Sequence, residues 1–160
     1  MVRSILTTAA LLGAASAVAA KAASTPEIVG TPSAAFVKST NDGQRSYTMS
    51  VVARFDQVLP REGMRVVIGP GLRKGQRVSR IFGGDQPHRI GKTSKHCYTI
   101  EAGRPMPVST PRSGARWKVA LVEQSGTSDA AVVVDTATVA LRRLPRDRTF
   151  GPAEAKQLGC

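Results

Sequence analysis

The sequence predicts an all-β fold: a small antiparallel β-sandwich, immunoglobulin-like, or a barrel, with a cleaved N-terminal signal helix and a short C-terminal helical turn. Three observations predict it: alternating apolar and polar residues in several segments, Gly and Pro between those segments, and an N-terminus with the pattern of a secretory signal. About seven short strands joined by turns are typical of a sandwich or a small barrel.

The N-terminus has the three parts of a signal peptide. Arg3 supplies a positive charge, residues 5–20 are uncharged and rich in Ala and Leu, and small residues follow. Ala17-Val18-Ala19 is an A-x-A site, so we expect cleavage after residue 19 or 20, with cleavage after residue 22 as the alternative. An uncleaved anchor is less favoured, because the uncharged run is about the minimum for a spanning helix.

The chain is therefore divided into a signal peptide, residues 1–20, and a single β-rich domain, residues 21–160. The remaining length suits one domain with its own core. We expect a periplasmic or secreted protein with no transmembrane anchor after cleavage.

The clearest alternation runs from Arg45 to Leu59 and predicts a strand. Its apolar face is formed by Tyr47, Met49, Val51, Ala53 and Phe55. A Pro- and Gly-containing turn over residues 60–63 and a second apolar face over 64–68 predict that two strands pair here as a hairpin.

A second hairpin is expected near the end of the chain. Alternation over residues 116–121, turn-forming residues over 124–129 and a Val-rich segment over 131–141 predict it. Weaker strands are predicted at 27–38, 77–82 and 95–101. A helical turn is predicted at 152–158, with Pro152 at its first position and Gly159 after its end.

Cys97 and Cys160 are the two cysteines of the chain. Two cysteines in an oxidising compartment most often pair, so we predict a disulfide between them. The alternatives are a free thiol or a disulfide to another molecule.

The sequence is strongly basic, with 23 Lys and Arg against 11 Asp and Glu. The excess is concentrated in residues 61–118, where only Glu62, Asp85 and Glu101 oppose it. Such charge attracts anions. The predicted binding residues, which form one basic face if their strands are neighbours, are Arg73, Lys74, Arg77, Arg80, Arg89, Lys92 and Lys95. The alternative is that these cations are only a solvated surface.

Catalytic and metal-binding patterns are not found in the sequence. It contains no G-x-S-x-G, H-E-x-x-H or C-x-x-C motif. His96 and Cys97 are adjacent, and neighbouring side chains on a strand point to opposite faces, so they do not form a catalytic pair. We therefore predict no catalytic residues, no metal and no cofactor.

These observations favour an exported, non-catalytic cationic β-domain that is an interaction or structural component of a cell-envelope or surface assembly. Its expected partner is an acidic envelope polymer or an envelope protein. Nucleic acid is not expected, because the chain is exported and the basic segment has few aromatic residues for stacking.

Two other functions remain open. The first is a small periplasmic cell-wall enzyme or enzyme inhibitor, for which the loop Gly83–His88 is the candidate inhibitory segment. The second is a cationic toxin, which fits the charge but lacks an amphipathic membrane-binding helix.

Overall fold

The computed structural model describes residues 24–160 except 85–86, 92, 107–108, 125–129 and 147. Its elements in chain order are β1 (Ile28–Asn41), β2 (Gln44–Phe55), β3 (Met64–Gly69), β4 (Arg77–Ser79), β5 (Ile81–Phe82), β6 (His88–Ile90), the 3₁₀ turn η1 (Thr93–Lys95), β7 (Cys97–Glu101), β8 (Arg104–Pro105), β9 (Arg116–Gln124), β10 (Ala130–Arg143) and α1 (Pro152–Gln157).

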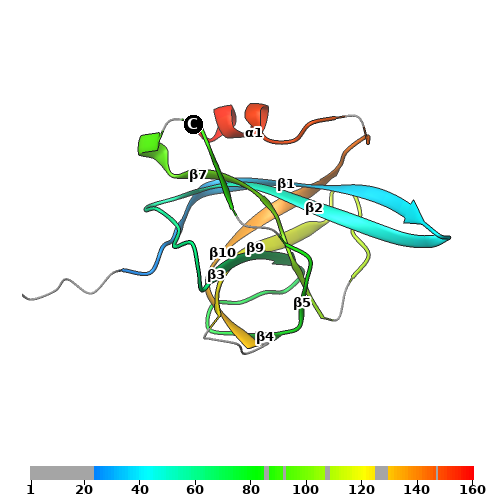
Figure 1. Cartoon of the computed structure of the whole chain (residues 1–160), viewed down its shortest axis with the longest axis horizontal. Coiled ribbons are helices and arrows are strands. Elements are labelled where there is room, and N and C mark those ends of the chain that lie inside the picture. Colours follow the sequence, from blue (N-terminus) through cyan, green and yellow to red (C-terminus); the bar gives the residue numbers. More distant parts are fainter. Residues whose placement is uncertain (1–23, 85–86, 92, 107–108, 125–129, 147) are drawn as a thin grey trace, which may run out of the picture.

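One curled, open sheet forms a half-barrel (Figure 1). Its strand order is β3-β9-β10-β1-β2-β7-β6, with β4 paired to β10 outside this path, and β5 and β8 form a separate two-stranded ribbon. The prediction of a mostly β fold with a short C-terminal helix is confirmed. An immunoglobulin-like sandwich is not confirmed, and the sheet is not purely antiparallel, since β1 runs parallel to β10.

Two apolar clusters hold the sheet together. The larger lies inside the curl and contains the predicted apolar faces of β2, β3 and β9, including Phe55, Ile68 and Leu121. The smaller lies on the other face of β3, β9 and β10, where Leu72 and Val78 cover it. β9 alternates only at its start; over residues 119–122 it is buried on both faces, and its sequence is continuously apolar there.

The predicted hairpin over residues 45–68 is wrong in its pairing, although both of its strands exist. The structure pairs β2 with β1 and β7, and it pairs β3 with β9. Residues 56–63 therefore connect distant parts of the curled sheet instead of forming a tight turn. Alternation identifies the buried face of a strand, but it does not identify the neighbouring strand.

The other predicted elements are closer to the structure. The hairpin near the end of the chain is confirmed, because β9 and β10 pair antiparallel. The strand predicted at 77–82 is broken into β4 and β5 at Arg80, whose φ is +52°. The helix begins at Pro152 as predicted, and Gly159 follows it with a φ of +74°.

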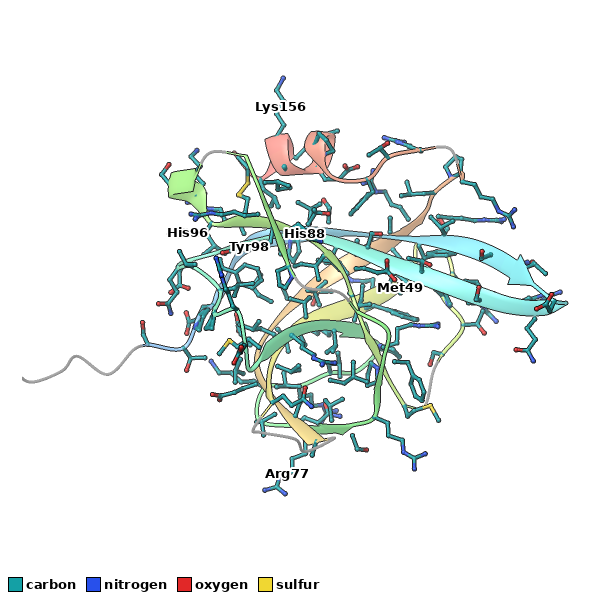
Figure 2. The ribbon with its side chains drawn as sticks, in the orientation of Figure 1. Met49, Arg77, His88, His96, Tyr98 and Lys156 are labelled. Carbon is teal, nitrogen blue, oxygen red and sulfur yellow. A yellow bond between two sulfur atoms is a disulfide. The ribbon has the colours of Figure 1, made fainter. Side chains whose placement is uncertain are left out.

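The predicted disulfide between Cys97 and Cys160 is present and ties the C-terminus to β7 (Figure 2). Cys97 is fully buried, and the Cα atoms of the two residues are 6.3 Å apart. Gly91 makes room for this contact: a Cβ at its position would lie 2.9 Å from the Cβ of Cys160. The disulfide and α1 thus cover the outer face of β7 and β2 at one end of the molecule.

None of the helices in the described residues is long and apolar enough to span a membrane. The signal peptide predicted at residues 1–20 lies outside the described residues.

Candidate functional site: the cationic surface

The predicted basic residues fall into two groups. The first consists of Arg73, Lys74, Arg77 and Arg80 and is called the β4 cationic group. The second consists of Arg89 and Lys95, beside β7; Lys92, which was predicted with them, lies outside the described residues.

The structure does not join these groups into one face. β4 pairs with β10, whereas β6 pairs with β7, so the two strands are not neighbours. Figure 2 shows Arg77 at the lower end of the molecule and His96, next to Lys95, near the upper end. The two groups therefore form separate surfaces.

All four side chains of the β4 cationic group are exposed. The turn before β4 is closed by two hydrogen bonds: the Gln76 N–H donates to the Arg73 carbonyl at 3.0 Å, and the Arg73 N–H donates to Gln76 Oε1 at 3.0 Å. Strand β10 holds this turn from the other side. The Gly75 N–H donates to the Val133 carbonyl at 2.8 Å, and the Val133 N–H donates to the Gln76 carbonyl at 2.9 Å.

These four hydrogen bonds hold the backbone of the turn in place, so the cationic side chains of the β4 cationic group extend from a rigid backbone. Within β4, Val78 is buried while Arg77 and Ser79 are exposed. The alternation of a strand thus directs Arg77 away from the core.

The second group has a different environment. The Arg89 guanidinium lies 2.9 Å from Nδ1 of His96. Because arginine has no acceptor atom, Nδ1 accepts this hydrogen bond, which places the proton of a neutral imidazole on Nε2. His96 has a φ of +40°, an uncommon value for a residue other than Gly.

Sequence-based candidates for chemistry are also placed by the structure. Cys97 is in a disulfide and is not available as a nucleophile. Within the described part of the chain, no group of three or more His, Cys, Asp or Glu residues could hold a metal ion. Of the candidate inhibitory loop Gly83–His88, residues 85–86 lie outside the described residues, and its Gly84 backbone packs against Gly103.

An open cleft of about 420 Å³ lies beside this loop. The residues that line it include Arg61, Glu62, Arg65, Ile81 and Gly83. The cleft carries both signs of charge, so it is a less clear anion site than the β4 cationic group.

No family model, curated protein or solved structure matches this chain. A functional conclusion for it therefore depends on the residues and geometry of the molecule itself.

A second cleft was not predicted from the sequence. It is an open cleft of about 540 Å³ that carries Lys38, Arg143 and Arg146. These cations come from segments far apart in the chain, and two of them belong to a C-terminal region whose charges balance overall. Only the parallel pairing of β1 with β10 brings them together, and that pairing has no local sequence signal.

Proposed function

We propose that this chain is an exported, non-catalytic domain that binds an acidic partner, either an envelope polymer or an envelope protein, as a component of a cell-envelope or surface assembly. The β4 cationic group is the proposed contact surface. The observation that carries the proposal is the rigid turn at Arg73–Gln76, which presents exposed cations from a backbone held on both sides by hydrogen bonds.

The electrostatics of the molecule support this proposal. The net charge of +12 generates a long-range attraction for polyanions. Among the described residues, the ion pair is that of Arg142 with Glu154 near α1, and none of these residues forms an ion pair with the β4 cationic group. The disulfide is consistent with an oxidising, exported location, where acidic surface polymers are available as partners.

The test is affinity capture from cross-linked native envelopes with the mature, oxidised protein as bait, at low and at high salt. The Arg73→Glu/Lys74→Glu/Arg77→Glu variant is expected to lose the captured partner, because the reversed charges repel an acidic surface. The matched control is Arg112→Glu/Arg116→Glu/Lys156→Glu, which changes the net charge equally at exposed positions elsewhere.

The comparison of the two variants separates a site from a general charge effect. Loss of capture by the first variant alone supports the proposed surface. Equal loss by both variants would mean adhesion driven by net charge, and unchanged capture by the first would remove the β4 cationic group from the interface. A single protein partner retained at high salt would identify an assembly component, whereas anionic polymers lost at high salt would identify charge-driven binding.

A further inference from the structure

The hairpin of β1 and β2 projects beyond the rest of the sheet (Figure 1). Its register gives the order of residue pairs from the core outward along one face: Phe36 lies opposite Met49, then Lys38 opposite Tyr47. Phe36 and Met49 are buried in the larger cluster. Because side chains two residues apart on a strand share a face, Lys38 and Tyr47 continue the inner face where the core ends.

The end of β10 lies beside β1, on the side opposite to β2. Phe36 is in register with Arg143 in the parallel pair, and the Leu144 N–H donates to the Phe36 carbonyl at 2.9 Å. The chain from Leu144 to Arg146 then runs beside β1. The result is the open cleft of about 540 Å³, which is lined by Lys38, Thr40, Arg143, Leu144, Pro145 and Arg146.

In the part of the chain that the structure describes, the cations lining the cleft are not paired with acids. Arg142, adjacent to Arg143, turns to the other face of β10, where its Nη2 donates to Glu154 at 2.7 Å. Among the described residues, no acid forms an ion pair with Lys38, Arg143 or Arg146. The acid of the hairpin, Asp42, is exposed at its tip.

A further cation lies over Tyr47, the residue in register with Lys38. The Arg104 guanidinium lies over the Tyr47 ring, 5.9 Å from its centroid, and Tyr47 contacts Phe36 edge to face. Burial lowers the pKa of Arg104, and the electrostatic effect of Tyr47 opposes this, but an arginine stays protonated at neutral pH. Arg104 therefore adds positive potential to the inner face, and its charge does not change near neutral pH.

We propose that this cleft binds a phosphate-bearing ligand. Two guanidinium groups offer paired N–H donors that match phosphate oxygens, and the ammonium of Lys38 supplies a compact third charge. The oxygens of a tetrahedral phosphate point in different directions, so three cations can each contact one of them. A planar carboxylate has only two oxygens and can contact fewer of the cations. The cleft is within the size range of small-molecule sites, so it has room for more than a free phosphate ion.

This site is separate from the β4 cationic group. Its residues come from β1, the end of β10 and the following segment, and none of them belongs to the surface proposed for the acidic partner. Failure of phosphate binding would leave the proposed function standing, and the reverse also holds.

The test is a titration of the mature, oxidised, isotope-labelled protein with pyrophosphate, followed by the backbone amide NMR signals. Saturable shifts are expected at residues 38, 40, 143, 144 and 146; Pro145 has no backbone N–H. The Arg143→Ala/Arg146→Ala variant is expected to bind about tenfold or more weakly, because charge-assisted hydrogen bonds are lost. Arg112→Ala/Arg116→Ala, the control with the same charge loss, is expected to keep its affinity. Both arginines of the cleft are exposed, and an unchanged amide spectrum elsewhere verifies the fold.

Two further arms distinguish the source of the phosphate group. One adds free glycerol 3-phosphate, and the other adds vesicles containing phosphatidic acid, with phosphatidylcholine vesicles as the blank. Binding in either arm that depends on Arg143 and Arg146 supports the proposal and identifies a soluble ester or a lipid headgroup. Non-saturating shifts spread over all exposed cations, or equal binding by both double variants, would overturn it.

Discussion

Glu154 is the buried charged residue of the described chain, with 2% of its surface exposed. Its carboxylate accepts hydrogen bonds from the Gly151 N–H at 2.9 Å and from Arg142 at 2.7 Å. Burial alone would raise the pKa of Glu154, but the hydrogen bonds from Gly151, Arg142 and its own backbone, together with the charge of Arg142, outweigh burial and lower it. One acid therefore joins the start of α1 to the end of β10.

The lowered pKa of Glu154 predicts a pH-dependent contribution to stability. A carboxyl group whose pKa is lower in the folded state stabilises fully above its unfolded pKa, about 4.3, and this contribution is lost as the pH falls through the folded pKa. Glu154→Gln is expected to lower the free energy of unfolding by about 1 to 2 kcal/mol at neutral pH. The value is modest because Arg142 is 44% exposed and water screens the pair.

Urea unfolding of the wild type and of Glu154→Gln at a series of pH values measures this difference. It is expected to shrink below the unfolded pKa and to vanish when both side chains are neutral. Glu62→Gln, at an exposed position, is the control and is expected to leave stability unchanged. A difference for Glu154→Gln that persists undiminished in acid would mean that shape, not charge, sets the effect.

At the scale of the elements, the disulfide attaches the C-terminus, which follows α1, to β7. The bridge joins residues 63 positions apart. Closing a loop of that size is worth about 4 kcal/mol in the chain-entropy account. The Cys97→Ala/Cys160→Ala variant is therefore expected to lose about that much stability and to expose the amides of α1 to hydrogen exchange.

Denaturant unfolding and amide exchange of this variant provide the measurement. Reduction of the wild-type protein should reproduce both effects, while the same reductant should not change the variant. If α1 stays protected without the bridge, its packing and the contacts of Glu154 are enough to hold it.

The elements also show how far the sequence predicts the fold. Alternation predicts β2, β3 and the start of β9 and their buried faces, because period-two burial is a local property, whereas β10 is predicted from its Val content alone. It did not predict that β3 pairs with β9, since partner choice depends on how the whole sheet curls. The break at Arg80 was missed as well, because a positive φ at a residue other than Gly has no composition signal.

The candidate sites divide in the same way. Arg73, Lys74 and Arg77 are close in sequence, so their shared turn could be predicted. The prediction that they form one basic face with Arg89 and Lys95 was wrong, because β4 and β6 are far apart in the strand order. Lys38 and Arg143 meet only through the parallel pairing of β1 and β10, which closes more than a hundred residues of chain and leaves no local pattern.

At the scale of the whole molecule, the disulfide is consistent with the oxidising compartment that the predicted signal peptide implies. A bridge that closes a long loop persists in an oxidising environment and is rare where thiols are kept reduced. The proposal of export thus has a structural counterpart in the bond between Cys97 and Cys160. Export also predicts that the protein produced in the periplasm contains the disulfide and that the protein produced in the cytoplasm does not.

We expect the full chain, expressed in a bacterium with a periplasm, to be recovered there without its first 19 or 20 residues, or without 22 in the alternative cleavage. Intact-mass measurement gives the cleavage point, and the two-hydrogen loss that accompanies the disulfide appears in the same spectrum. A version that begins at residue 21 and stays in the cytoplasm should instead be reduced and less stable by about 4 kcal/mol. Oxidation of that form in vitro should restore its stability, because the disulfide accounts for the expected difference. Recovery of the full chain uncleaved in the cytoplasm, with both thiols free, would contradict export.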